Sequence, residues 1–201
     1  RVENEMKNPL KPEWPADRAT KGQKGASIKI VEYSDFQCPY CSKGFRTLQE
    51  VLKAYPGKVE FMFKHLPLPM HPMAVPAAKR FEAIALQDPV KAYKFHDEIF
   101  QNQSKLNSEG EKFLDAAAKK VGADLARMKT DMEGDKVKAR IDADMAEATR
   151  LMAKAASLGD YKAKAWIEKN FPEKPVWLKE LGGLAEKSLP GEGQDLAGGD
   201  Q

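Results

Sequence analysis

The 201-residue chain lacks the features that mark several large classes of protein. No apolar run approaches the roughly 20 residues that a membrane-spanning helix needs, so membrane insertion is not expected. The 33 basic and 30 acidic residues nearly balance, and the basic ones are scattered, so nothing indicates nucleic-acid binding. Only two cysteines are present, too few for a disulfide scaffold. Hydrophobic residues make up 42% of the chain, which is enough for the core of one domain with an inserted subdomain.

The first part of the chain predicts an arm that leads into a strand. Residues 1–26 are rich in proline, glycine and charge, which indicates an extended arm with one short edge strand. The segment 27–33, SIKIVEY, alternates Ile28 and Ile30 against polar residues and predicts a strand.

A helix and a second strand follow. The helical pattern CSKGFRTLQEVLKAY begins after Pro39, since proline suits the first turn of a helix, and it stops at Pro56-Gly57. In the segment 58–66, KVEFMFKHL, the residues Val59, Phe61 and Phe63 alternate with charged or flexible residues. Together, residues 27–66 predict a βαβ unit, in which the two strands are normally parallel.

Helical patterns dominate the remaining chain after a proline-rich loop over 67–76. We expect helices over 74–86, 90–101, 109–121, a short stretch with Leu125, Met128 and Met132, about 135–158, and 161–170. Ser108 and Glu111 have the spacing of a capping box that would open the helix over 109–121. The Gly-rich, acidic residues 187–201 predict a disordered tail.

The two cysteines, Cys38 and Cys41, stand two residues apart in DFQCPYC and allow three interpretations. A structural disulfide would close a four-residue loop and stabilise the fold by only roughly 2 kcal/mol. A zinc site would combine both cysteines with His65 and His71, although the gap between the pairs is longer than in zinc fingers. The third interpretation is a redox pair.

The position of the cysteines favours the redox pair. Cys38 is expected at the start of a helix, where unpaired N–H groups and the macrodipole favour an anion, and the thiolate is the reactive form of a cysteine. Cys41 is expected one turn further in, within bonding reach but less exposed. This asymmetry predicts that Cys38 forms a mixed disulfide and that Cys41 resolves it.

The motif IVEYSDFQCPYC, followed by a helix and by VEFMFKHLPLPMHPMA, resembles the DsbA-like thiol–disulfide oxidoreductases of the thioredoxin superfamily. The resemblance covers roughly residues 22–159. It implies an α/β, thioredoxin-like fold with a helical insertion over 67–159. It also implies a bacterial enzyme of the periplasm or another cell-envelope compartment, which exchanges disulfides with unfolded exported proteins and a redox partner protein.

The resemblance also assigns roles to single residues. Glu32 matches the acidic residue that the family places beneath its active site, where it would mediate proton transfer for the inner cysteine; otherwise Glu32 is a solvent-facing strand residue. Phe36 is expected to be a core or groove aromatic. No cofactor is implied, and homo-oligomerisation is left open.

Two departures from the family pattern stand out. The second half of the sheet, over 160–186, is atypical or incomplete, and only Pro175 could replace the cis-proline that the family places opposite the cysteines. Divergence, a partner chain that completes the sheet, or a rebuilt or truncated sequence would each explain this. In addition, Pro39 and Tyr40 form the dipeptide of glutaredoxins, which are weaker oxidants, so the direction of electron flow stays open.

The sequence therefore predicts a thiol–disulfide oxidoreductase, with substrates lying near residues 67–73. The alternative is a binding or chaperone-like module that keeps the thioredoxin-type first half without turning over.

Overall fold

The computed structural model describes residues 11–157 of the chain. The chain divides into two units, residues 1–148 and 149–201, and the sheet and most of the helices belong to the first. The predicted helix over 161–170, the atypical half over 160–186 and the predicted tail over 187–201 lie outside the described residues.

The described sheet has three strands in the order β1-β3-β2. Strand β2 (Ile28–Ser34) lies parallel to β3 (Val59–His65), in a register that runs from Ile28 opposite Val59 to Ser34 opposite His65. The short β1 (Lys21–Gly22) pairs antiparallel with β3, which confirms the expected edge strand. Because β2 and β3 are parallel, both end at the same edge of the sheet, and Cys38 follows that end of β2.

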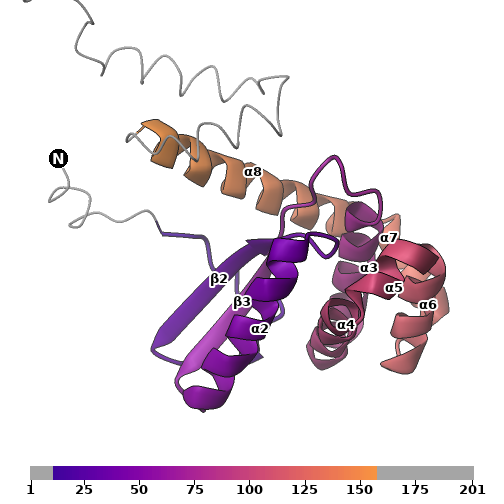
Figure 1. Ribbon diagram of the computed structural model, residues 1–201, viewed down its shortest axis with the longest axis horizontal. Helices are drawn as coiled ribbons and strands as arrows, with labels where there is room; N and C mark the ends of the chain where they lie inside the picture. The colour runs from indigo at the N-terminus through magenta and orange to yellow at the C-terminus, as the bar shows by residue number, and fades with distance from the viewer. Residues whose placement is uncertain (1–10, 158–201) are drawn as a thin grey trace, which may run out of the picture. The chain divides into compact units, whose positions relative to one another are not determined.

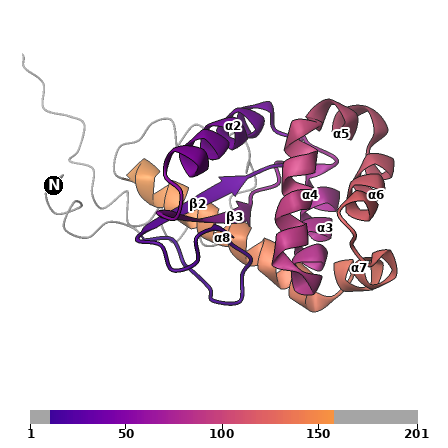
Figure 2. The same ribbon diagram turned by 90° about the horizontal axis from the view of Figure 1, so that it is seen from below.

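Helix α2 (Pro39–Ala54) connects β2 to β3 and completes the predicted βαβ unit. It begins with Pro39 and buries Phe45 and Leu48. Figure 2 shows α2 on one side of the two long strands and the first part of α8 on the other.

The helical part follows β3 and lies beside the sheet (Figure 1). Its helices are α3 (Ala74–Gln87), α4 (Pro89–Gln101), α5 (Gln103–Glu109), α6 (Glu111–Lys120), α7 (Leu125–Met132) and α8 (Asp135–Ser157). The expected helices over the described residues are present, and α5 is an additional one. None of the helices in this range is both long and apolar enough to cross a membrane.

The predicted capping box of Ser108 and Glu111 is wrong. Ser108 lies inside α5, and its hydroxyl donates to the carbonyl of Ser104 at 3.1 Å. The break between α5 and α6 falls at Gly110, whose positive φ of 56° is a conformation that glycine adopts at little cost.

Strand β3 is buried along its whole length, although charged residues alternate with apolar ones in its sequence. The charged residues between the apolar ones are buried with partners. Glu60 accepts a hydrogen bond from the backbone N–H of Gly25 at 2.9 Å, and Lys64 contacts Glu147 of α8. Helix α2 covers one face of the long strands and the first part of α8 covers the other (Figure 2), so β3 is buried on both faces, as is usual for parallel strands.

Aromatic side chains fill the core between the sheet and the helical part. The ring centroid of Phe36 lies 4.8 Å from that of Phe63 and 5.3 Å from that of Phe100, which confirms Phe36 as a core aromatic. His96 is buried in this cluster, and burial lowers its pKa, so the imidazole is neutral at physiological pH.

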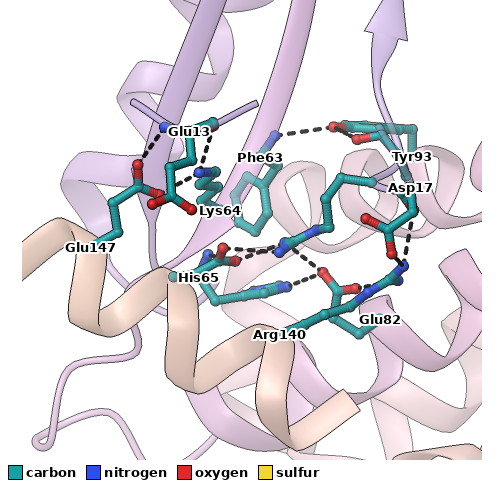
Figure 3. A network of polar contacts seen from close by, with 12 residues as sticks. Glu13, Asp17, Phe63, Lys64, His65, Glu82, Tyr93, Arg140 and Glu147 are labelled. Carbon is teal, nitrogen blue, oxygen red and sulfur yellow. Dashed lines mark hydrogen bonds and ion pairs between the residues drawn. The ribbon is translucent and has the colours of Figure 1, made fainter. Parts of the chain in front are cut away.

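A buried network of ion pairs joins the N-terminal segment to three other elements (Figure 3). Arg18 donates to both oxygens of Asp144 on α8, at 2.9 and 2.7 Å, and to Glu82 on α3 at 2.9 Å. His65, the last residue of β3, donates its backbone N–H to Asp144 at 2.9 Å, and its Nε2 lies 3.0 Å from Glu82. Arg140 on α8 also donates to Glu82, at 3.1 Å. The network therefore fixes the end of β3 that lies beside the cysteines.

Candidate active site

Cys38 is the residue immediately before α2 and acts as its N-cap, with extended backbone angles of φ −73° and ψ 124°. Its N–H donates to the carbonyl of Asp35 at 3.1 Å, and its own carbonyl accepts from the N–H of Ser42 at 3.2 Å. Pro39 occupies the first helical position, where its missing N–H costs nothing. Both cysteines are free thiols.

The expected order of exposure is wrong. Cys38 is only 9% exposed, whereas Cys41 is half-buried. The helical part contributes to this burial, because Gln103 of α5 donates from its side-chain amide to the carbonyls of Phe36 and Cys38, both at 2.9 Å. Tyr40, between the cysteines, is 75% exposed.

The Cys41 thiol nevertheless holds its proton more tightly than an ordinary cysteine. Burial raises its pKa, and the nearby Cys38 thiol raises it further, to about 12. The Ser34 hydroxyl and the N–H of Asp35, which lies 3.4 Å from the Cys41 sulfur, oppose this shift only in part. Cys41 is therefore a protonated thiol at neutral pH, and it needs a base before it can attack a disulfide.

Glu32 is half-buried on β2, beside α2. Its Oε1 lies 3.5 Å from the point that a Cβ on Gly44 would occupy, and Gly44 is three residues after Cys41. Burial raises the pKa of Glu32, and the Ser34 hydroxyl lowers it. In the part of the chain that the structure describes, Glu32 forms no ion pair, so the placement suits an acid that exchanges a proton; that role stays a prediction.

Asp35 organises the loop that carries Cys38, and the sequence interpretation missed it. Its buried carboxylate accepts hydrogen bonds from the N–H of Gln37 at 2.7 Å and of Leu68 at 2.8 Å, and lies 2.7 Å from Nδ1 of His71. Two of these partners belong to the proline-rich loop after β3. Asp35 therefore holds residues 67–73 against the cysteine loop.

Gln37 adds a second link from the cysteine loop. Its side-chain oxygen accepts from the N–H of Met73 at 2.8 Å, and its side-chain nitrogen donates to Asn107 of α5 at 2.9 Å. The proline-rich loop and α5 are both tied to the cysteine loop by these bonds. No motif pointed to Gln37 or Gln103, because their partners are distant in sequence.

The residues proposed for a zinc site do not gather around the cysteines. His65 faces Glu82, and His71 faces Asp35. In the described range, the group that best combines such ligands is His65, Glu82 and Asp144, whose candidate atoms lie within 4.8 Å of one another. Arg18 and Arg140 donate to the same carboxylates, so this group fits an ion-pair network better than a metal site.

Pro175, the candidate for the cis-proline, lies outside the described residues.

A parallel βαβ unit with a Cys-x-x-Cys pair at the start of its helix defines the thioredoxin-like class of fold. A family model described as thioredoxin matches residues 16–156, and the chain belongs to this family.

Known relatives match only parts of their own length. The Na(+)/H(+) antiporter NhaA 1 of Mycolicibacterium vanbaalenii is 33% identical over 150 residues, which are 72% of this chain and 23% of the antiporter. The probable disulfide bond formation protein D of Bacillus cereus is 31% identical over 142 residues, which are 67% of this chain and 65% of that protein. The chain thus spans about a quarter of the antiporter and just under two thirds of the Bacillus protein.

The fold is also that of solved DsbA-like structures. The thiol-disulfide exchange protein alpha-DsbA2 of Wolbachia pipientis matches with a TM-score of 0.60 and 18% identity, over 68% of this chain and 71% of that one. This likeness and the family match confirm the predicted thioredoxin-like fold.

Proposed function

We propose that the protein is a thiol–disulfide oxidoreductase that works through Cys38, Pro39, Tyr40 and Cys41. The observation that carries the proposal is the difference between the two thiols. Cys38 stands at the N-terminus of α2, where unpaired N–H groups favour negative charge. Cys41, one turn further in, is held as a protonated thiol with a pKa of about 12.

The two thiols act in sequence. The Cys38 thiolate attacks a substrate disulfide and forms a mixed disulfide, while the first substrate sulfur leaves as a thiolate. Cys41 then loses its proton to Glu32 and attacks the Cys38 sulfur, which releases the second substrate thiolate. The cysteine pair gives up two electrons and the substrate disulfide is reduced. In the opposite direction, a substrate thiolate attacks the oxidised pair at Cys38, and Cys41 leaves and regains its proton.

The substrates are unfolded or extended segments of exported proteins, and a redox partner protein resets the cysteine pair in the periplasm or another cell-envelope compartment. Three apolar side chains are exposed at or near the cysteine loop: Tyr40, at 75%, Met70, at 52%, and Val75, at 46%. Exposed side chains of this kind offer contact to an extended chain without selecting one sequence. Hydrogen bonds that the N–H groups of Leu68 and Met73 donate to Asp35 and Gln37 hold the loop that carries Met70 beside the cysteines.

The test compares three forms of the protein in both directions of exchange. The wild type is assayed for reduction of a protein disulfide and for oxidation of a reduced, unfolded protein. Cys38→Ser is expected to lose both activities, because it removes the attacking sulfur. Cys41→Ser, the matched control, is expected to accumulate a mixed disulfide through Cys38, which mass spectrometry detects.

Equal activity of the wild type and Cys38→Ser would reject this proposal. The absence of both activities in the wild type as well as in Cys38→Ser, together with suppression of substrate aggregation, would instead identify a binding or chaperone-like module.

A further inference from the structure

Ser34 is a buried residue whose hydroxyl has no regular hydrogen-bond partner among residues 11–157. It is the last residue of β2, it is 2% exposed, and it lies opposite His65 in the sheet. A buried polar group without a partner costs about 1–3 kcal/mol, so its presence calls for a physical reason.

The position of Ser34 supplies that reason. Side chains two residues apart on a strand point to the same face, so Ser34 shares a face with Glu32. The backbone N–H of the next residue, Asp35, lies 3.4 Å from the Cys41 sulfur, so the end of β2 that carries Ser34 borders Cys41. In keeping with this placement, the Ser34 hydroxyl lowers the pKa of both Glu32 and Cys41. A hydroxyl can accept one hydrogen bond while it donates another, so it can connect a donor to an acceptor.

We propose that the Ser34 hydroxyl passes a proton between the Cys41 thiol and the Glu32 carboxyl group. This inference rests on the proposed function, because it concerns the step in which Cys41 resolves a mixed disulfide. It makes Ser34 a relay residue beside the reacting sulfur.

The relay consists of two coupled proton transfers. The Cys41 thiol gives its proton to the Ser34 oxygen as the Ser34 hydroxyl proton moves to the Glu32 carboxylate. The Cys41 sulfur attacks the Cys38 sulfur, the bond between Cys38 and the substrate sulfur breaks, and the substrate leaves as a thiolate. Serine is unchanged, and glutamate ends protonated. Burial favours this outcome, because it raises the pKa of Glu32.

Other titratable groups face the relay from neighbouring elements. Cys38 lies beside Cys41 at the start of α2, and Asp35 contacts the Cys41 sulfur through its backbone N–H. The Asp35 carboxylate is directed to Leu68 and His71 of the proline-rich loop. Among these groups, Ser34 is the one that lowers the pKa of both Cys41 and Glu32.

The experiment follows both thiols in one reaction. Reduced protein is mixed with an excess of a small aromatic disulfide whose leaving thiolate is coloured. Attack by Cys38 releases the first coloured thiolate, and attack by Cys41 on the mixed disulfide releases the second. The two phases are recorded from pH 5 to pH 9 (about two pH units on either side of neutrality).

Three substitutions separate the effect of the Ser34 hydroxyl group from the effect of side-chain shape. Ser34→Ala removes it, Ser34→Thr retains it, and Ser34→Val has nearly the shape of threonine without it. We expect the second phase at neutral pH to slow by about 10-fold to 100-fold in Ser34→Ala and Ser34→Val, which is at or below the lower end of general acid–base effects. Ser34→Thr should recover most of that loss, and the first phase should change little in all three.

The outcomes separate this proposal from the function on which it rests. A first phase that is as slow as that of an ordinary thiol would count against the proposed oxidoreductase. A normal first phase with an equal second phase in the wild type, Ser34→Ala and Ser34→Val would overturn the relay alone. Equal slowing in Ser34→Thr and Ser34→Val, at every pH, would also overturn it, because shape rather than the hydroxyl would then control the rate.

Discussion

At the scale of single residues, Asp35 supports the site through several hydrogen bonds that converge on one buried carboxylate. It accepts from Gln37 and Leu68 and lies against His71, so both of its oxygens are used. An ionised carboxylate suits such a position because it is only an acceptor, whereas an amide must present donor hydrogens on one side. The geometry of the cysteine loop therefore depends on the charge of this residue.

Asp35→Asn should loosen that loop. The amide NH2 would face at least one N–H donor, so we expect the free energy of unfolding to fall by about 1–3 kcal/mol. The rate at which Cys38 reacts with a small disulfide should fall as well. Urea unfolding and the first phase of the coloured-thiolate assay measure the two effects.

Asp88→Asn is the matched control. Asp88 is the N-cap of α4 and accepts from the N–H of Val90 at 2.7 Å, and asparagine caps helices about as well as aspartate. Equal behaviour of Asp35→Asn and Asp88→Asn in both measurements would contradict the special role of Asp35.

The sequence located the cysteine pair but not its environment. Cys38 and Cys41 could be predicted as a pair at a helix start because strand, cysteines and helix are contiguous in the chain. Their relative exposure could not, because Gln103, which helps to cover Cys38, lies 65 residues away. Ser34 and Asp35 carried one signal: Ser34 ends β2 and Asp35 follows it, at the carboxyl end of a parallel strand, where functional groups are often placed.

At the scale of elements, α5 connects the helical part to the cysteine loop. Gln103 donates two hydrogen bonds to carbonyls on either side of Gln37, and Asn107 accepts one from Gln37 itself. Helix α5 has only seven residues, too few to be stable alone, so its position depends on these contacts. Motion of α5 should therefore change access to Cys38.

Gln103→Leu should make Cys38 more accessible. The substitution keeps much of the side-chain volume but removes both donors, and loss of about 1 kcal/mol of net hydrogen bonding would shift local opening by about five-fold. We expect a comparable rise in the rate of Cys38 alkylation by a small neutral reagent, measured by mass spectrometry.

Ser108→Ala on the same helix is the control, since the Ser108 hydroxyl donates to carbonyls within α5 and has no other hydrogen-bond partner among residues 11–157. An alkylation rate in Gln103→Leu that matches the wild type would show that α5 does not limit access.

The elements themselves were largely predictable. Strand β2, helix α2 and strand β3 each show a clear hydrophobic period, and the βαβ topology follows from general rules. The capping-box prediction was wrong because Ser108 lies inside α5 and bonds to a carbonyl of that helix. The spacing of Ser108 and Glu111 alone does not reveal this competing helix. The buried polar face of β3 was missed because Lys64 and Glu60 find partners only in the folded chain.

At the scale of the first unit, the buried network around Glu82 links pH to stability. Burial alone would raise the pKa of Glu82, but its contacts with His65, Arg18 and Arg140 outweigh burial and lower the value from 4.5 to about 2. A carboxyl group whose pKa is lower in the folded state than in the unfolded state stabilises the fold. This stabilisation is fully present at pH values above the pKa of the unfolded state. That contribution is lost as the pH falls through the value in the folded state.

Glu82→Gln should therefore lower the free energy of unfolding on the order of 3 kcal/mol at pH 7, from a pKa difference of about 2.5 units at roughly 1.4 kcal/mol each. The difference from the wild type should be complete above about pH 5 and should shrink as the pH falls toward 2. Urea unfolding at several pH values measures both quantities.

Glu133→Gln serves as the control at this scale. Its ion pair with Lys79 spans 3.1 Å at the surface, with the Glu133 side chain 74% exposed, so its removal should cost less than about 1 kcal/mol. A difference for Glu82→Gln that is equally small, or that does not depend on pH, would contradict the assigned role of the network.

The path of the N-terminal segment has a practical consequence for anyone who shortens or fuses this protein. Residues 13–18 look like a dispensable leader in the printed sequence, yet Arg18 neutralises two acids of the interior and Glu13 contacts both Lys64 and Glu147. A cut placed just before β2 would leave Glu82 and Asp144 without Arg18, the one arginine that pairs with both of them among the described residues. Tags and fusion partners therefore belong ahead of residue 11, and a library of deletions should show a sharp fall in soluble yield once Arg18 is removed.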